Sequence, residues 1–89
     1  MFYVYILQSR KDQKLYTGST KDLRKRFSAH NAGEVFSTKS RTPFELIYYE
    51  AYKVESDARK REKNLKLRSK ALAQLKRRLT GTLKFGVGV

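Results

Sequence analysis

The segment FYVYILQSRKDQKLYTG, residues 2–18, predicts a β-hairpin. Tyr, Val, Ile and Thr favour strands and concentrate in residues 2–8 and 14–18, and the polar run SRKDQ between them suits a turn. If the connection holds an even number of residues, Tyr5 lies opposite Tyr16 and both phenols emerge on one face of the sheet, whereas a one-residue slip would separate them. Opposed tyrosines are also good cross-strand packing partners, so the pair alone has a purely structural explanation.

The residues after the hairpin change from a strand pattern to a helical one near Asp22. Three residues share the i, i+4, i+7 spacing of one helix face: Leu23, Phe27 and His30. Ser19 or Thr20 is available as the N-cap, and Gly33 is available as the stop. Residues 34–42 are polar and basic, and we expect a loop or a helical turn there.

The second half of the chain predicts one more strand and two more helices. Aromatic and β-branched residues after Pro43 predict a strand from about Phe44 to Tyr52. Ser56 and Asp57 are candidate caps for a helix that runs to about Arg68, and Ser69 is a candidate cap for another. That last helix carries a leucine stripe: Leu72, Leu75 and Leu79.

The expected order is β-β-α-β-α-α, a small mixed α/β (α+β) fold with helices flanking a three-stranded sheet. We expect residues 1–80 to form one domain and the glycine-containing residues 81–89 to form a tail.

Charge points to a polyanionic partner. Lys and Arg number 21 against 8 Asp and Glu, a formal net charge of +13. Nucleic acid is favoured over an acidic membrane surface, because the basic helices are too sparsely apolar to lie in a bilayer interface. The absence of cysteine excludes disulfides and thiolate zinc sites. The apolar run of residues 2–7 is too short to span a bilayer and lacks a basic leader, so we expect an intracellular protein, cytoplasmic or associated with the nucleoid.

Two polar residues of the first predicted helix are directed toward the sheet. His30 lies on the apolar face, and Arg26 lies at its edge. A guanidinium at that place can bind two phosphate oxygens and stays protonated. Alternatively, the stem of Arg26 covers apolar surface with its head in water, and His30 is a partly buried residue at the helix end.

Glu62 is the only acidic residue in ARKREKNLK, residues 58–66, and it falls on the inward face of the predicted helix. A carboxylate turned toward a core is costly unless it is paired or binds a metal. Mg²⁺ is often held by one or two carboxylates, with waters and substrate phosphates completing its shell. The structural alternative is an ion pair with Lys66 or with Arg26.

In their order and spacing, these residues resemble the active-site pattern of the GIY-YIG nuclease superfamily over roughly residues 2–66. The motifs that carry the resemblance are Tyr3-Val4-Tyr5, Tyr16-Thr17-Gly18, the stretch from Gly18 to Arg26, His30, and Arg61-Glu62-Lys63. Two departures stand out. Tyr3 replaces the glycine of the first motif, and no asparagine follows Asn64, which is too close to Glu62 to match the downstream asparagine that many members use.

The resemblance implies a catalytic group made of Tyr5, Tyr16, Arg26, His30 and Glu62. Glu62 would hold one divalent cation, Mg²⁺ or Mn²⁺, and Arg26 would stabilise charge on the scissile phosphate. Tyr5, with Tyr16 beside it, would position or deprotonate the attacking water, and His30 would hydrogen-bond a phenol or the nucleophile. The residues expected to contact nucleic acid are Gly18, whose backbone would approach a phosphate, and Lys21, Arg24, Lys25, Lys39, Arg41 and Lys66.

The sequence therefore predicts a metal-dependent endonuclease that hydrolyses phosphodiester bonds, with DNA expected ahead of RNA and DNA repair as an implied role. The alternatives are a non-catalytic nucleic-acid-binding module with the same fold and a protein-interaction domain that uses the leucine stripe. If the nuclease prediction is right, Tyr5, Tyr16, Arg26 and Glu62 should share one face. Arg26 and Glu62 should then border one basic, solvent-open cleft.

Overall fold

A computed structural model describes residues 1–67 and 70–83 of the chain. Its elements are β1 (Phe2–Ser9), β2 (Leu15–Thr20), α1 (Leu23–Asn31), a 3₁₀ turn (Lys39–Arg41), β3 (Phe44–Tyr52), α2 (Glu55–Lys66) and α3 (Lys70–Arg78). This order confirms the predicted β-β-α-β-α-α fold. The predicted cap at Ser69, the helix end at Arg68 and most of the predicted tail, residues 84–89, lie outside the described residues.

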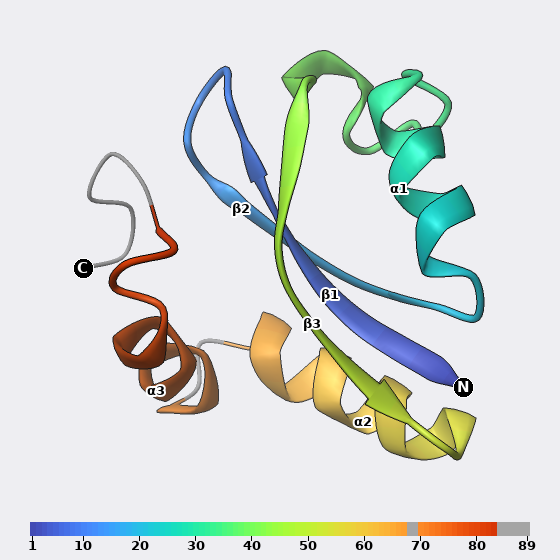
Figure 1. The fold of residues 1–89 in the computed structure, drawn as a ribbon, viewed down its shortest axis with the longest axis vertical. Coiled ribbons are helices and arrows are strands. Elements are labelled where there is room, and N and C mark those ends of the chain that lie inside the picture. The colour runs from blue at the N-terminus through green and yellow to red at the C-terminus, as the bar shows by residue number, and fades with distance from the viewer. Residues whose placement is uncertain (68–69, 84–89) are drawn as a thin grey trace.

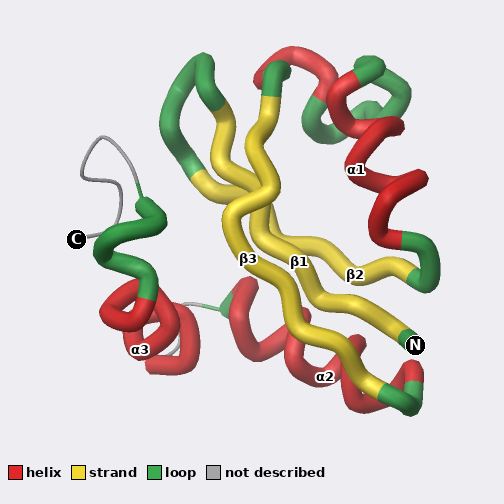
Figure 2. Tube along the Cα trace, viewed as in Figure 1, coloured by secondary structure: helices red, strands yellow, loops and turns green. Residues whose placement is uncertain are grey.

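The three strands form one antiparallel sheet in the order β2-β1-β3, so β1 is central and β2 is an edge strand. Helix α1 covers one face, and α2 and α3 cover the other (Figures 1 and 2). The alternation of side chains along β1 divides the core accordingly: Val4 and Ile6 pack with α2 and α3, whereas Tyr5 and Leu7 pack with α1. None of the described helices has the length and apolar composition that crossing a bilayer requires.

The hairpin register differs from the predicted one by two positions. Tyr5 is paired with Gly18, and Tyr16 is paired with Leu7, so the prediction that Tyr5 lies opposite Tyr16 is wrong. The turn between β1 and β2 is longer than a Tyr5–Tyr16 pairing would allow. In this longer turn, the Ser9 hydroxyl accepts hydrogen bonds from turn amides, and Gln13 takes a positive φ of 61°. A two-residue shift preserves which face each side chain occupies, so both phenols still project toward α1.

Helix α1 begins at least two residues later than its expected caps would place it. Asp22 is the N-cap, and its carboxylate accepts a hydrogen bond from the Lys25 amide. Ser19 and Thr20 do not cap the helix, because both still belong to β2. Gly33 follows the helix with a positive φ of 74°, a conformation that glycine adopts at little steric cost, which confirms the predicted stop.

The caps predicted for α2 are also displaced. Ser56 and Asp57 lie in the first turn of the helix, and Val54 occupies the N-cap position without a side-chain hydrogen bond. Glu55 and Asp57 place negative charge in that first turn, which stabilises the helix N-terminus in place of a cap.

The leucine stripe of α3 belongs to the core of the protein itself. Leu75 is buried, and Leu72 and Leu79 pack against the same cluster as Val4 and Leu65. The prediction of a protein-interaction surface on this stripe is therefore wrong.

Candidate active site at the edge strand β2

The phenol of Tyr5 lies at the centre of the candidate site. Tyr5 is buried in the middle of β1, with its ring 6.4 Å from that of Tyr16, centroid to centroid. Its hydroxyl end lies against the backbone of Gly18, where an added Cβ would come within 2.5 Å of the phenol oxygen and 2.6 Å of Cζ. Gly18 thus makes room for Tyr5, and the expected approach of its backbone to a phosphate stays a prediction.

His30 joins the Tyr5 phenol to a loop hydroxyl. It lies in the last turn of α1 and is fully buried. Its Nε2 lies 2.8 Å from the Tyr5 phenol oxygen, and its Nδ1 lies 2.8 Å from Oγ1 of Thr38. The imidazole also packs against Tyr16, at 5.0 Å between ring centroids. The histidine is therefore held at both nitrogens.

The hydroxyl of Thr38 has a second acceptor within reach, which favours one tautomer of His30. Thr38 lies 3.5 Å from the carbonyl of Val35 and can donate its single proton there, near the outer limit of a hydrogen bond. It then accepts from Nδ1–H, which leaves the Nε2 lone pair to accept the Tyr5 O–H. Sequence reasoning missed Thr38, because one threonine in a polar loop carries no pattern that would single it out.

Burial sets the protonation of this pair. It lowers the pKa of His30 below 6.5, and the positive charge of Arg26 acts in the same direction. Burial raises the pKa of Tyr5 above 10.0, although a side-chain hydrogen bond with Arg26 opposes it. Near neutral pH the site therefore holds a protonated phenol that faces a neutral imidazole.

Glu62 approaches the site from the opposite layer of the molecule. It projects from α2 and accepts a hydrogen bond from Ser19 of β2, with 2.5 Å between Ser19 Oγ and Oε1. The expectation that Glu62 shares a sheet face with Tyr5 and Tyr16 is therefore wrong. Ser19 and Gly18 are adjacent on an edge strand and point to opposite faces, so the glutamate meets the tyrosine layer at the edge of the sheet.

Lys66 connects the two layers. Its Nζ lies 2.7 Å from Oε2 of Glu62 and 5.9 Å from the ring centroid of Tyr16. The ion pair with Lys66, the structural alternative for Glu62, is thus present in place of a pair with Arg26. Burial acts to raise the pKa of Glu62, but hydrogen bonds from Lys66 and Ser19 outweigh it and hold the pKa below 4.5.

The donor set around Glu62 fits one hard divalent cation. A carboxylate oxygen is the ligand type that Mg²⁺ prefers, and one carboxylate suffices where water and phosphate complete the shell. The Glu62 side chain is 20% exposed, so solvent and substrate can reach it. No group of three or more His, Cys, Asp or Glu side chains that could hold a metal occurs within residues 1–67 and 70–83, which excludes a site made of such side chains alone there.

Some of the predicted cationic contacts are exposed near the start of α1, and others contact side chains of the protein itself. Arg26 is exposed on α1, and the other exposed cations around the start of that helix are Lys21, Arg24 and Lys25. Arg41 has partners within the protein, because it pairs with Asp12 at 2.9 Å and stacks over Phe44. Lys39 is exposed, and its Nζ lies over the ring of Phe36.

Three hollows of about 840, 490 and 210 Å³ lie on the surface, and the predicted cleft shared by Arg26 and Glu62 coincides with none of them. Neither residue lines any of these three. The candidate site lies instead around the edge of β2, with Arg26 on the α1 side and Glu62 on the α2 side.

Comparison with known proteins assigns the family. The sequence matches the GIY-YIG catalytic domain over residues 1–78. A UPF0213 protein from Haloquadratum walsbyi is 43% identical over 65 residues, which cover 72% of this chain and 72% of the relative. Another, from Staphylococcus saprophyticus, is 45% identical over 65 residues and covers 72% of this chain and 78% of the relative.

A solved structure agrees with the family match. The solution NMR structure of a UPF0213 protein from Bacillus halodurans is 32% identical and has a TM-score of 0.51, over 98% of this chain and 89% of that one. The family match ends where α3 ends and so spans the whole sheet and all three helices. The chain therefore belongs to the GIY-YIG domain family, whose fold suggests a nuclease.

Proposed function

We propose that the protein is a metal-dependent endonuclease that hydrolyses phosphodiester bonds in nucleic acid, with DNA preferred to RNA. The observation that carries this proposal is the hydrogen bond of 2.8 Å between the Tyr5 phenol and Nε2 of a buried, neutral His30. A structural role alone does not need a histidine held at both ring nitrogens beside an exposed arginine.

His30 can serve as the proton acceptor of the site. The phenol of Tyr5 is protonated at neutral pH and cannot take a proton from water unless it loses its own. Nε2 of His30 can accept that proton as Tyr5 takes one from the attacking water, so the water proton is transferred through Tyr5 to the imidazole. Thr38 supports this step, because a hydroxyl that accepts from Nδ1–H leaves Nε2 unprotonated.

Arg26 would bind the scissile phosphate. Its guanidinium stays protonated at any pH the protein meets, and its planar donors match two phosphate oxygens. Charge that develops on those oxygens during attack is stabilised at a fixed cation, which is often worth several kcal/mol, on the order of a hundredfold or more in rate.

Glu62 would hold the single Mg²⁺ or Mn²⁺. GIY-YIG nucleases generally use divalent metal ions, and the carboxylate of Glu62 is ionised and partly exposed. Such an ion neutralises phosphate charge and lowers the pKa of bound water. Lys66 occupies Oε2 and would give way to the ion or turn toward the substrate, where it would act with the other proposed nucleic-acid contacts: Gly18, Lys21, Arg24, Lys25, Lys39 and Arg41.

A non-catalytic nucleic-acid-binding module is the second candidate, and two observations favour it. Both oxygens of Glu62 already have partners in Ser19 and Lys66, and the sequence has no asparagine beyond Asn64. Under this candidate the Tyr5–His30 pair would be a structural remnant and the net charge of +13 would account for binding.

A cleavage assay separates the two candidates. Purified protein is incubated with single-stranded, duplex and branched DNA and with RNA, in Mg²⁺, in Mn²⁺ and in EDTA. We expect metal-dependent cleavage that falls about a hundredfold or more in Arg26→Ala and Glu62→Gln. The control variant Glu34→Gln should cut at the wild-type rate, because Glu34 is exposed in the loop after α1 and lines none of the three hollows described above. Cleavage that both site variants retain in full would reject the nuclease, and metal-dependent cleavage lost in them would reject the binding module.

We further propose that the domain ends near residue 80 and that the protein acts inside the cell. The family match to residue 78 and the affinity for nucleic acid implied by the charge support these two points.

A further inference from the structure

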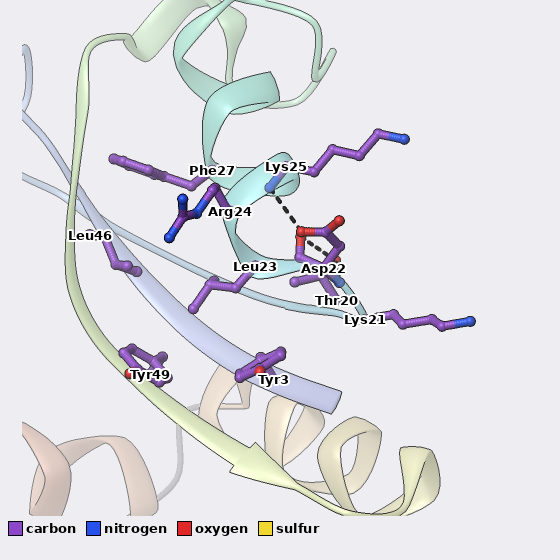
Figure 3. A pocket seen from close by; sticks show the side chains of 10 residues that line it. All are labelled: Tyr3, Thr20, Lys21, Asp22, Leu23, Arg24, Lys25, Phe27, Leu46 and Tyr49. Atoms are coloured by element: carbon purple, nitrogen blue, oxygen red, sulfur yellow. Dashed lines mark hydrogen bonds between the residues drawn. The ribbon is translucent and has the colours of Figure 1, made fainter. Parts of the chain in front are cut away.

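A second feature of the α1 face lies beside the candidate active site, and none of the five proposed catalytic residues lines it. A hollow of about 840 Å³ opens between the start of α1 and the sheet. Figure 3 shows the side chains that line it: Tyr3, Thr20, Lys21, Asp22, Leu23, Arg24, Lys25, Phe27, Leu46 and Tyr49. Its volume lies within the range of roughly 300–1,000 Å³ that is usual for ligand sites.

The floor of this groove is aromatic and uncovered. Tyr3 of β1 and Tyr49 of β3 lie on the α1 face, with ring centroids 6.0 Å apart in an edge-to-face arrangement. Tyr49 is 54% exposed, an unusual amount of aromatic surface for a strand residue that faces a helix. Helix α1 packs over Tyr5 and Leu7 but leaves this end of the sheet open. The exposed ring is available for stacking.

The rim of the groove is cationic. Lys21, Arg24 and Lys25 line it, against the single carboxylate of Asp22. That carboxylate already accepts the Lys25 amide hydrogen as the N-cap, so its charge is directed at the helix terminus. In Figure 3 Arg24 lies near Phe27 on the sheet side of α1, whereas Lys21 and Lys25 extend outward from the rim. A ligand that fits both the aromatic floor and the cationic rim combines a flat π-system with adjacent negative charge.

We propose that the groove is a subsite for one unpaired nucleobase of a bound nucleic-acid strand. The base stacks on Tyr49, and the neighbouring phosphates lie against Arg24 and the two rim lysines. Aromatic rings flanked by cations are the usual means of holding single-stranded nucleic acid, because every base presents a π-face. An apolar peptide would not use the cationic rim.

The position of the groove relates it to the reacting phosphate. In the β1–β3 register Tyr49 is the direct partner of Tyr5, so the floor of the groove adjoins the central residue of the candidate active site. A strand whose base occupies the groove would place a nearby phosphate beside Arg26, which is exposed and interacts with the Tyr5 phenol. The subsite rests on the proposed function only in taking nucleic acid as the ligand.

Binding measured without cleavage tests the subsite. A short fluorescein-labelled single strand and the matching blunt duplex are titrated by anisotropy in EDTA. We expect Tyr49→Ala to weaken binding of the single strand about fivefold to a hundredfold, the usual effect of removing one stacked base. Duplex affinity should change less than about twofold, because paired bases cannot enter the groove. Tyr49→Phe keeps the ring and should bind like the wild type.

Val54→Ala is the control, because Val54 is also a solvent-exposed apolar residue, at 51% exposure, but lies outside the groove. It should leave single-strand affinity unchanged. Equal thermal unfolding of Tyr49→Ala and wild type, together with shifts of the Leu23 and Leu46 methyl resonances when the single strand is added, would support the assignment. Unchanged single-strand affinity in Tyr49→Ala, or equal losses for single strand and duplex, would overturn the subsite and leave the nuclease proposal standing. Wild-type protein that binds neither probe would overturn both.

Discussion

One phenol, that of Tyr5, determines the geometry of the candidate site at the scale of single residues. Gly18 gives it space, Nε2 of His30 receives its hydrogen bond, and Arg26 lies near enough to affect its pKa. Each neighbour limits the others, because a side chain at position 18 would displace the phenol and a displaced phenol would lose His30. A change at either the glycine or the histidine should therefore disturb the Tyr5 phenol.

Replacing Gly18 with alanine should destabilise the protein and misplace Tyr5. The added Cβ would overlap the end of a rigid, buried ring, and we expect a loss of about 1–3 kcal/mol in the free energy of unfolding, as is typical of overpacking. Gly81→Ala is the control, since no atom lies within 4 Å of a Cβ there, and it should change stability by less than about 0.5 kcal/mol. Urea unfolding of both variants measures this. Equal stability of the two would show that the phenol does not fill the space at Gly18.

His30 should make stability depend on pH in a window that extends downward from about pH 7.5. Its pKa is lowered in the folded state, so the unfolded chain binds the proton more readily and stability falls as the pH drops below about 6.5. His30 is the only histidine in the chain, so His30→Gln should lose this dependence within that window. Urea unfolding at a series of pH values gives the comparison. Parallel curves for wild type and variant would contradict the buried, neutral assignment.

At the scale of secondary-structure elements, a polar cluster as well as apolar packing holds α2 against β3. Glu50 of β3 accepts hydrogen bonds from the phenols of Tyr48 and Tyr52 and from Arg61 of α2, whose Nη2 lies 3.0 Å from Oε2. Burial and the bond to Glu50 raise the pKa of Tyr52 to about 12. The cluster fixes α2 against β3 and thereby the distance at which Glu62 reaches β2.

Neutralising this cluster should loosen α2. Glu50 and Arg61 are mostly buried, and Glu50→Gln leaves a cation with a weaker partner, so we expect a loss of about 1–3 kcal/mol in unfolding free energy. The exposed pair of Glu55 and Arg59 on the same helix supplies the comparison, and Glu55→Gln should cost less than about 1 kcal/mol, from the exposed pair and the helix terminus together. Thermal unfolding compares the two variants. Similar costs would mean that the cluster does not hold the helix.

The elements themselves could be predicted from the sequence, because apolar periodicity is a local signal. The strands, the helices and their order agree with the structure, and the bounds predicted for β3 match. The hairpin register and the helix caps could not be predicted, since they depend on turn geometry around Ser9 and Gln13. In the site, the direction of His30 followed from helix periodicity. Thr38, Ser19 and the layer from which Glu62 approaches depend on tertiary contacts that no local pattern encodes.

For the molecule as a whole, α1 covers one face of the sheet and α2 and α3 cover the other (Figure 1). Residues from the two sides come near each other at the edge strand β2, where Gly18 contacts Tyr5 and Ser19 hydrogen-bonds Glu62. Arg26 comes from one layer and Glu62 from the other, and the chain carries a net charge of +13. A nucleic-acid strand that lies across this edge would contact both layers at once, and its binding should weaken steeply with salt. The central claim is that residues from both layers act as one catalytic unit.

Single-turnover cleavage by wild type, Tyr5→Phe, Glu62→Gln and the double variant in Mg²⁺ tests that claim most directly. Residues that act as a unit have strongly non-additive effects. We predict that each single variant loses about a hundredfold or more in rate and that the double variant is no more than about tenfold slower than the slower single variant. Cleavage at the wild-type rate in either single variant, or losses that multiply in the double variant, would contradict a single site formed across the edge of β2.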